Sequence, residues 1–240
     1  MELSGKTILV TGGTDGIGAC LIRQLRDKGA AVITSGRDPG RVEETRAAGF
    51  EVIEADLSLR EGVDAVLGAV GGRPLDILIN NAGAGVDHDF RDGAPDLEAA
   101  DRTAFLNFNA PVRLISQLMP VLKSRPQAMI VNVTSGLAIA PRAGGPVYCA
   151  SKAALRSYGM AIRHQLKGTP VRLMEALPPV VETKMTAGRA NRKMAPEECA
   201  RQIISGIERD ARQVNVGMVK VLSAVYSLSP ALARRIMLRF

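Results

Sequence analysis

The chain has 240 residues, 46% of them hydrophobic. This length and composition predict one globular domain of the size usual for α/β proteins and exclude a disordered protein. No apolar run reaches the roughly 18 residues that a membrane-spanning helix needs. Only 3% of the residues are aromatic and tryptophan is absent, so the core must be mainly aliphatic. The chain start shows no apolar signal region, and three widely spaced cysteines make no disulfide frame; both features predict a cytoplasmic protein.

The net charge of +7 belongs to the C-terminal quarter of the chain. From Thr183 onward there are eleven basic and four acidic residues, whereas residues 1–182 are neutral as a group. Such asymmetry fits an anionic substrate or partner, or a solvated basic face that binds nothing. Nucleic-acid binding is not expected, because the chain is poor in aromatic side chains for base stacking and shows no recognised motif.

Short, nearly continuous apolar runs predict strands that are buried on both faces. They lie at Thr7–Thr11, Ala31–Ser35, Glu51–Ala55, Leu75–Asn80, Ala128–Thr134 and Val171–Leu177, with a short seventh run at Gln213–Gly217. Helical spacing between them predicts helices at Gly16–Lys28, Pro39–Ala47, Ser58–Val70, Leu97–Lys123, Tyr148–Leu166 and Pro196–Arg212. This alternation predicts a single-domain α/β Rossmann fold, a doubly wound parallel sheet of about seven strands with helices on both faces.

Three segments depart from this regular pattern. Pro111 and Pro120 lie inside the long helical pattern, where proline should kink or split a helix. Residues 183–195 are polar and basic without a clear period, which predicts a mobile substrate loop. Residues 218–240 form an apolar and basic tail.

A glycine-rich loop follows the first predicted strand, in the order Thr11-Gly12-Gly13-Thr14-Asp15-Gly16-Ile17-Gly18. Gly12 permits a tight turn, and Gly16 and Gly18 allow the backbone to approach a pyrophosphate. The following helix N-terminus adds free N–H groups and partial positive charge. The spacing differs from the common G-x-G-x-x-G fingerprint, so a plain strand–helix turn is the alternative for this loop taken alone.

The end of the second predicted strand distinguishes the two nicotinamide dinucleotides. An acid there bonds the ribose 2′-hydroxyl, whereas an arginine accommodates a 2′-phosphate. Ser35-Gly36-Arg37 contains no acid, which favours NADP(H), with NAD(H) as the alternative. Two considerations leave the choice open: Arg37 can be a solvated loop residue, and the charge of Asp15 would repel a 2′-phosphate.

Tyr148 and Lys152 lie four residues apart on a predicted helix and therefore share a face. A free tyrosine has a pKa of about 10, and a neighbouring ammonium stabilises the phenolate and lowers that pKa. The tyrosine can then donate a proton to a carbonyl oxygen as hydride arrives, or accept one in reverse. Ser135 ends a predicted strand and can hydrogen-bond the same oxygen. The Tyr–Lys pair alone occurs often by chance, but its order after the glycine loop and Ser135 makes it specific.

In these motifs, from about Lys6 to about Thr183, the chain resembles the short-chain dehydrogenase/reductase family. The resemblance implies that Asn107 completes a catalytic tetrad with Ser135, Tyr148 and Lys152, holding a water in a proton relay that starts at the lysine; Asn109 is the fallback. With the loop and strand-end residues described above included, the predicted cofactor-binding residues are Gly12, Thr14, Asp15, Gly16, Ile17, Gly18, Ser35, Arg37, Asp56, Leu57, Asn81, Ala82, Gly83, Tyr148, Lys152, Pro178, Val181 and Thr183.

One departure from the family is the pair Pro178-Pro179, where Pro-Gly is usual. Proline removes a backbone N–H, so a cofactor contact through that group would be lost. Together with Gly-Gly-Thr in the glycine loop, this pair resembles a bacterial subgroup named after DltE oxidoreductases. The family resemblance also implies a homodimer or homotetramer that pairs Leu97–Lys123 and Tyr148–Leu166 with their symmetry mates.

The substrate pocket is expected outside the carboxyl ends of the strands. The predicted substrate residues are Leu137, Ile139 and Arg142, which follow Ser135, and Met185 in the loop, for which plain packing is the alternative. We expect a small-molecule ketone or secondary alcohol that is mostly apolar around the reacting carbon. It would be anionic or linked to an acidic carrier if it meets the basic residues Lys184, Arg189, Arg192 and Lys193.

Two further alternatives remain. A non-catalytic NADP(H)-binding sensor can use the same fold, although it need not keep the complete tetrad. The tail at 218–240 can rest on a membrane surface, but a subunit interface or a cover on the core is the preferred interpretation. His88 and His164 are isolated, so no metal site is expected.

Overall fold

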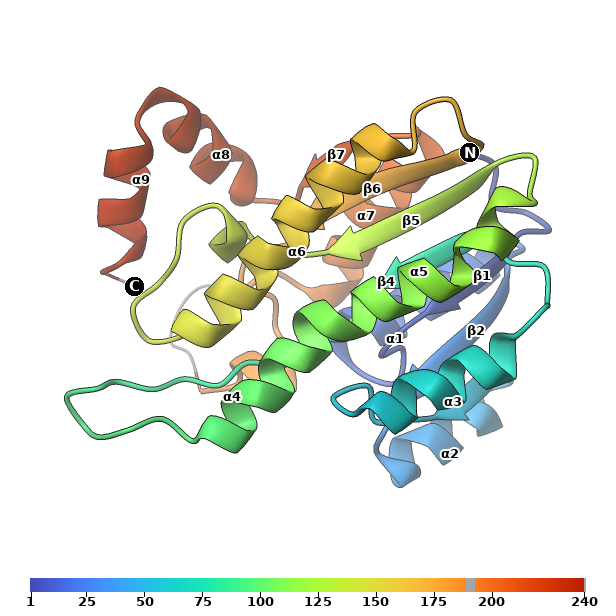
Figure 1. Ribbon diagram of the computed structural model, residues 1–240, viewed down its shortest axis with the longest axis horizontal. Coiled ribbons are helices and arrows are strands. Elements are labelled where there is room, and N and C mark those ends of the chain that lie inside the picture. Colours follow the sequence, from blue (N-terminus) through green and yellow to red (C-terminus); the bar gives the residue numbers. More distant parts are fainter. Residues whose placement is uncertain (189–192, 240) are drawn as a thin grey trace.

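The computed structural model describes residues 1–188 and 193–239. Within these ranges, seven parallel strands form one sheet in the order β3-β2-β1-β4-β5-β6-β7 (Figure 1). The strands are β1 (Thr7–Val10), β2 (Ala31–Gly36), β3 (Glu51–Glu54), β4 (Ile77–Asn80), β5 (Ala128–Val133), β6 (Val171–Leu177) and β7 (Gln213–Asn215). Strand order reverses between β1 and β4, and such sheets bind ligands outside the carboxyl ends of their strands at this point.

Helices cover both faces of the sheet (Figure 1). One layer consists of α1 (Gly16–Asp27), α2 (Pro39–Ala47) and α7 (Pro196–Glu208), and the other contains α3 (Arg60–Val70), α5 (Ala110–Lys123) and α6 (Pro146–Gln165). Each layer has its own aliphatic core. Along β1, Ile8 and Val10 face the first core and Leu9 faces the second, as the alternation of a strand requires. The predicted single-domain, doubly wound α/β fold is confirmed.

The long helical pattern is divided just before its first proline. α4 (Leu97–Ala104) runs into a π-helical turn, η1 (Phe105–Asn109), and α5 then begins with Pro111 in its first turn. Pro111 has no N–H for the carbonyl oxygen of Asn107, four residues earlier, so regular α-helical bonding cannot pass through this point. Pro120 lies inside α5 without ending it.

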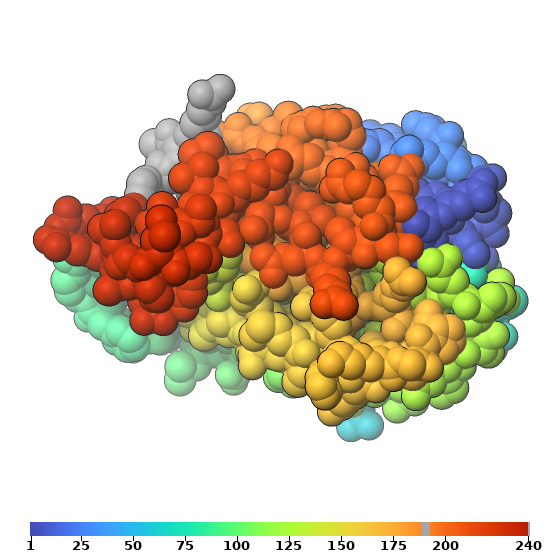
Figure 2. All heavy atoms as spheres, turned by 90° about the horizontal axis from the view of Figure 1, so that it is seen from above, coloured from blue at the N-terminus to red at the C-terminus, as the bar shows by residue number. Residues whose placement is uncertain are grey.

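Two short turns and a helical hairpin lie beyond the carboxyl ends of the central strands. η2 (Gly136–Ala138) follows β5, and η3 (Lys184–Thr186) follows β6. The base of the predicted loop is closed by two backbone hydrogen bonds of 2.9 Å, from Glu182 to Met194 and from Met194 to Val180. The tail folds into α8 (Val219–Leu228) and α9 (Pro230–Met237), which form one end of the molecule (Figures 1 and 2).

In the part of the chain that the structure describes, no helix is both long and apolar enough to cross a membrane. Cys20, Cys149 and Cys199 are buried and are not joined in disulfides. Among the same residues, no group of three or more His, Cys, Asp or Glu side chains is placed to hold a metal ion.

Candidate active site

The glycine loop joins β1 to α1 and is held against the two neighbouring strands. The Gly13 N–H donates to Thr34 Oγ1 on β2 at 3.0 Å. From the other side, the side-chain amide of Asn81 donates to the carbonyl oxygens of Thr11 and Gly12 at 3.0 and 3.2 Å. The loop is therefore fixed by side chains that follow β4 or lie in β2, which places it at the strand-order reversal.

Close backbone approach explains why glycine recurs in and around this loop. Gly12 and Gly16 have φ values of 67° and 51°, in the left-handed region that favours glycine. A Cβ on Gly18 would lie 2.0 Å from the carbonyl oxygen of Gly12, and a Cβ on Gly36 would lie 2.4 Å from Thr14 Cγ2. Glycines packed this closely beside a helix N-terminus form the cradle that a dinucleotide pyrophosphate requires. The residues present thus fit a nicotinamide dinucleotide.

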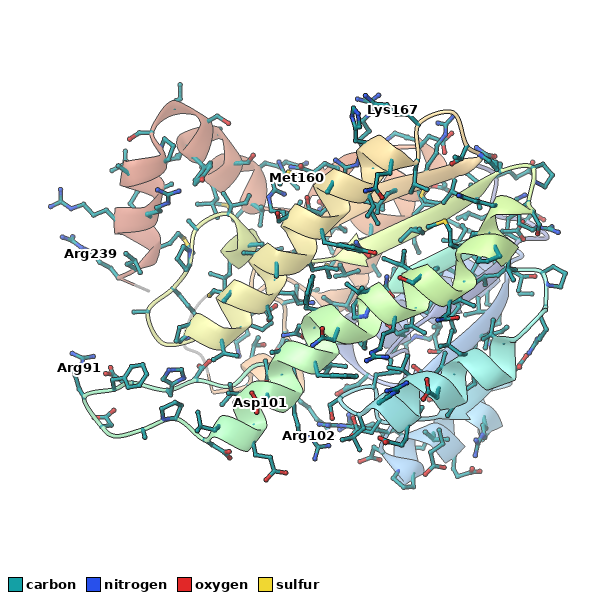
Figure 3. All side chains as sticks on the ribbon, viewed as in Figure 1. Arg91, Asp101, Arg102, Met160, Lys167 and Arg239 are labelled. Carbon is teal, nitrogen blue, oxygen red and sulfur yellow. The ribbon has the colours of Figure 1, made fainter. Side chains whose placement is uncertain are left out.

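Two groups of ion pairs lie where β1, β2 and β3 end. Arg41 NH1 is 2.6 Å from Asp15 Oδ2. Arg37 NH1 and Arg102 NH2 are 3.6 and 2.6 Å from Asp56 Oδ2. Arg102 projects from α4 toward the start of α3 (Figure 3). The sequence did not indicate Arg41 or Arg102, because neither belongs to a local motif and only the fold brings them to these carboxylates.

Asp56 is held as a carboxylate. Burial acts to raise its pKa, but hydrogen bonds from Ser58 and the charges of Arg37 and Arg102 outweigh burial and lower the pKa below its ordinary value. Leu57 beside it is buried. Ser35, at the end of β2, accepts a hydrogen bond of 3.4 Å from the Gly12 N–H. These predicted cofactor residues therefore lie together at the carboxyl ends of β1, β2 and β3.

Ser135 and Lys152 are tied to the end of the same strand. The Lys152 ammonium is buried and donates to the carbonyl oxygen of Val133, the last residue of β5, at 2.9 Å. Two residues later Ser135 begins η2, and its Oγ accepts a hydrogen bond of 3.1 Å from the Leu137 N–H. Tyr148 lies one turn before Lys152 on α6 and faces the same cavity. The three predicted catalytic side chains therefore meet at one place.

Burial alone lowers the pKa of Lys152 from 10.5 to about 8. Desolvation disfavours the charged form of the amine, whereas its hydrogen bond to Val133 stabilises the donor. An amine with this pKa can gain and lose a proton close to neutral pH, which suits a proton relay.

Asn107 is buried in η1, and its side chain is fully engaged. Its amide nitrogen donates to the carbonyl oxygen of Ala84 at 2.8 Å and to Ser151 Oγ at 3.0 Å, while its Oδ1 accepts from the Ala84 N–H at 3.1 Å. A Cβ on Gly83 would lie 3.1 Å from Asn107 Oδ1 and 3.2 Å from Lys152 Nζ. Asn107 and Lys152 therefore converge on the segment that follows β4.

Between the two candidate asparagines, the geometry selects Asn107. Asn109 is exposed, whereas Asn107 is buried against the segment that carries the predicted cofactor residues Asn81, Ala82 and Gly83. Ser151, which bonds Asn107, was not predicted, although its place three residues after Tyr148 puts it on the catalytic turn of α6.

A cavity of about 1230 Å³ opens at the carboxyl ends of β4, β5 and β6. Its lining includes Ser135, Tyr148 and Lys152. The predicted cofactor residues that also line it are Ile17, Asn81, Gly83, Pro178, Val181 and Thr183. Predicted catalytic residues and predicted cofactor residues from distant parts of the sequence thus line one cavity.

Three of the four predicted substrate residues line this cavity: Leu137, Arg142 and Met185. Ile139, which directly follows η2, is not part of the lining. Arg142 is 12% exposed and forms an ion pair with Asp87, which also lines the cavity.

The basic residues proposed to meet an anion divide into three groups. Lys193 lines the cavity, and its Nζ donates to the carbonyl oxygen of Ala187 at 3.2 Å. Lys184 is exposed and is not part of the lining. Arg189 and Arg192 lie outside the described residues. The case for an anionic substrate therefore depends on Lys193 and Arg142.

The C-terminal hairpin supplies a wall of the cavity that the sequence only partly indicated. Apolar residues of the tail predicted a cover or an interface, and the structure places seven of them from α8 and α9 in the lining: Val219, Val221, Leu222, Val225, Ala233, Ile236 and Met237. No local motif links these residues to the predicted catalytic residues, because their place in the cavity depends on the direction in which the chain leaves β7.

A family model and a curated relative both match this chain. The family model of short chain dehydrogenases matches residues 6–194. The chain is 36% identical over 224 residues to an uncharacterized oxidoreductase, DltE, of Bacillus subtilis (strain 168), covering 89% of each protein. This match agrees with the subgroup that the Pro-Pro and Gly-Gly-Thr motifs indicate.

Two solved structures with bound nicotinamide dinucleotides have the same architecture. A short chain dehydrogenase from Burkholderia cenocepacia J2315 in complex with NADP is similar over 99% of each chain, with a TM-score of 0.89 and 26% identity. L-Sorbose reductase from Gluconobacter frateurii, complexed with NADPH and L-sorbose, is similar over 92% of this chain and 99% of its own, with a TM-score of 0.79 and 26% identity. The chain therefore belongs to the short-chain dehydrogenase/reductase family of oxidoreductases.

Proposed function

We propose that the protein is an NADP(H)-dependent oxidoreductase that interconverts a ketone and a secondary alcohol, with Tyr148 as the acid–base group. One observation carries the proposal: Ser135, Tyr148 and Lys152 line a single cavity that also receives Ile17 and Thr183 from the glycine-loop side. A dinucleotide sensor would need the cradle but would gain nothing from a buried lysine behind a tyrosine.

Each side chain has a distinct part in the proposed reduction. When bound, the nicotinamide supplies the hydride. Tyr148 donates its phenolic proton to the carbonyl oxygen, and Ser135 donates a hydrogen bond to the same oxygen. The Lys152 ammonium stabilises the phenolate that remains. Its pKa of about 8 allows it to pass a proton onward through water near Asn107, and oxidation of an alcohol reverses these transfers.

The preference for NADP(H) rests on the arginines at the edge of the cradle. Arg37 follows β2 and is 60% exposed, so a 2′-phosphate can compete with Asp56, 3.6 Å away, for its guanidinium. The repulsion expected from Asp15 is offset, because Arg41 pairs with that carboxylate at 2.6 Å. Arg41 thus adds a second cation next to the same position. Two similar enzymes carry NADP or NADPH in their structures, which supports the same choice.

The test is consumption of NADPH and of NADH, followed by nicotinamide absorbance, over a panel of carbonyl compounds. The panel should hold free ketones, quinones, keto acids and carrier-linked ketoacyl groups. We expect turnover of at least one ketone, faster with NADPH than with NADH. Tight NADPH binding without turnover of any member would overturn the enzymatic proposal and favour a sensor.

A further inference from the structure

The cavity extends well beyond the groups that would react with a carbonyl. Its far side is formed by the seven aliphatic residues of α8 and α9 that line it, which we call the hairpin wall: Val219, Val221, Leu222, Val225, Ala233, Ile236 and Met237. Among the described residues of α8 and α9, no charged or aromatic side chain lines the cavity. The charged lining residues, Asp87, Arg142, Lys152 and Lys193, all come from other segments. The cavity is therefore polar at the reacting end and aliphatic at the hairpin end.

The hairpin wall is continuous with the catalytic serine. Gly136 follows Ser135 directly and packs against the first turn of α8. A Cβ on Gly136 would lie 2.8 Å from Val219 Cγ2 and 3.5 Å from Leu222 Cδ2. The aliphatic surface therefore begins one residue away from Ser135, with no intervening layer of polar groups.

The hairpin is fixed at its base. The Val216 N–H donates to the carbonyl oxygen of Leu177 at 3.0 Å, and the Gly217 N–H donates to Gln202 Oε1 at 3.1 Å. Gly217 has a φ of 52°, and a Cβ there would lie 2.9 Å from Met194 Cε. These contacts set the direction in which α8 leaves the sheet, so the wall is positioned by the fold.

Farther out, α9 packs on α8 through Ala233, which is fully buried, and through Arg234, whose guanidinium bonds the Tyr226 hydroxyl at 3.1 Å. The hairpin forms one end of the molecule in both views (Figures 1 and 2). Val221 and Ile236 remain 54% and 42% exposed although they line the cavity. Their apolar surface is thus left partly uncovered by the protein itself.

The cavity is large enough for an extended substrate beside the nicotinamide end of the cofactor. Pockets for small molecules commonly measure roughly 300–1,000 Å³, and this cavity of about 1230 Å³ exceeds that range. The adenosine-side residues Gly12, Ser35 and Asp56 are not in its lining, so the volume serves the nicotinamide end and the substrate.

We propose that the substrate carries an extended aliphatic chain and that the hairpin wall binds this chain while the carbonyl or hydroxyl carbon lies at Tyr148. The proposal rests on the proposed oxidoreductase function and names its substrate class. A wall without charges gives no partner to a polar substituent, and a wall without aromatic rings offers no stacking surface to a planar one.

The first experiment measures kcat/KM with NADPH for unbranched methyl ketones of increasing chain length, from butanone to dodecanone. Each methylene buried on the wall should raise kcat/KM by up to about fourfold. Val225→Trp places a large ring in the wall and should lower the ratio of kcat/KM for decanone over butanone by at least about tenfold. Leu228→Trp is the matched control, because Leu228 lies on the same helix, is 89% exposed and does not line the cavity.

The outcomes separate the two proposals. A steep rise with chain length that Val225→Trp flattens and Leu228→Trp preserves supports the aliphatic-chain site. Turnover that is independent of chain length overturns it while leaving the oxidoreductase proposal intact. If no ketone is turned over, the oxidoreductase proposal fails. Binding of an aliphatic chain to the hairpin wall is then tested by fluorescence, which does not depend on catalysis.

That second experiment uses the absence of tryptophan from the chain. Ile236→Trp introduces a single fluorophore into the wall, and Leu232→Trp introduces one on the same helix outside the cavity. The two native side chains are similarly exposed, at 42% and 50%. We expect a decanol titration to shift the emission of Ile236→Trp to shorter wavelength and to leave Leu232→Trp unchanged. Equal responses, or none, would overturn the site.

Discussion

Lys152 has the environment least like that of an ordinary lysine. It is buried on α6, it donates a hydrogen bond to the carbonyl oxygen of Val133, and burial brings its pKa to about 8. A buried ammonium destabilises a fold unless a counter-charge offsets the lost hydration, and burial is the one cause that sets this pKa. The protein thus keeps a destabilising group next to Tyr148, as expected of a functional lysine.

The lowered pKa of Lys152 makes the free energy of unfolding depend on pH. The pKa of Lys152 is lower in the folded chain, about 8, than its ordinary 10.5, so the unfolded chain binds the proton more tightly. The charged lysine therefore destabilises the folded state below pH 8. This destabilisation disappears as the pH rises toward 10.5, the ordinary pKa of lysine. Lys152→Met should be more stable than wild type at neutral pH by about 1–3 kcal/mol, while losing turnover.

Urea unfolding of both proteins across this pH range measures the effect. The stability advantage of Lys152→Met should shrink between pH 8 and the ordinary pKa of 10.5. An advantage that does not change with pH, or a less stable variant at neutral pH, would show that the ammonium is not destabilised by burial.

Arg41 provides a second test at the residue scale, on cofactor choice. Its removal leaves the Asp15 carboxylate without its 2.6 Å partner, next to the position proposed for the 2′-phosphate. Arg41→Ala should raise the KM for NADPH about tenfold or more and change the KM for NADH little. Replacing Asp15 by Ser in that variant should restore part of the loss.

The control for this prediction is Arg60→Ala, which removes an exposed arginine paired with Asp64 on α3, away from the cradle. In Arg60→Ala, the KM for NADPH and the KM for NADH should both stay at their wild-type values. If Arg41→Ala weakens NADPH and NADH equally, Arg41 acts on the loop as a whole and does not select the phosphate.

Among the secondary-structure elements, the loop before α1 makes the strictest demand on its sequence. A Cβ on Gly18 would lie 2.0 Å from the Gly12 carbonyl oxygen, and this backbone atom cannot move aside without opening the cradle. Gly18→Ala should therefore abolish NADPH binding and lower the free energy of unfolding by at least about 1–3 kcal/mol.

Gly68 provides a matched substitution, because it is an exposed glycine within α3 and a Cβ there would meet nothing within 4 Å. Gly68→Ala should raise the free energy of unfolding by about 0.5–1 kcal/mol, through the better helix propensity of alanine. Calorimetric NADPH titration and denaturant unfolding check both variants. Equal behaviour of the two would mean that Gly18 is not confined by Gly12.

The elements also show what the sequence can predict. Strands buried on both faces and amphipathic helices gave near-correct ranges, because periodicity and burial are local properties of the chain. The Tyr148–Lys152 pair was predictable for the same reason, since helical spacing fixes a shared face. The π-helical turn at Phe105–Asn109 was not, because it depends on where Asn107 bonds Ala84 and Ser151 as well as on Pro111.

Across the whole molecule, the site combines groups that are far apart in the sequence. Asn107, Ser135 and Tyr148 come from three segments around β4, β5 and α6, and the hairpin wall comes from the last two helices. The contacts of Arg41, of Arg102 and of the seven wall residues could not be predicted, because each contact depends on the packing of remote elements. A homodimer or homotetramer through α4, α5 and α6 stays a prediction, for which light scattering is the measurement.

Tyr148 is the group proposed to exchange a proton with the substrate oxygen. The most direct test compares kcat and the NADPH dissociation constant for wild type, Tyr148→Phe and Tyr158→Phe, the last being a tyrosine farther along α6 that packs on Phe108. Tyr148→Phe should lower kcat by about 100-fold or more with NADPH binding unchanged, and Tyr158→Phe should retain wild-type turnover. Tyr148→Phe with near wild-type kcat would contradict the account.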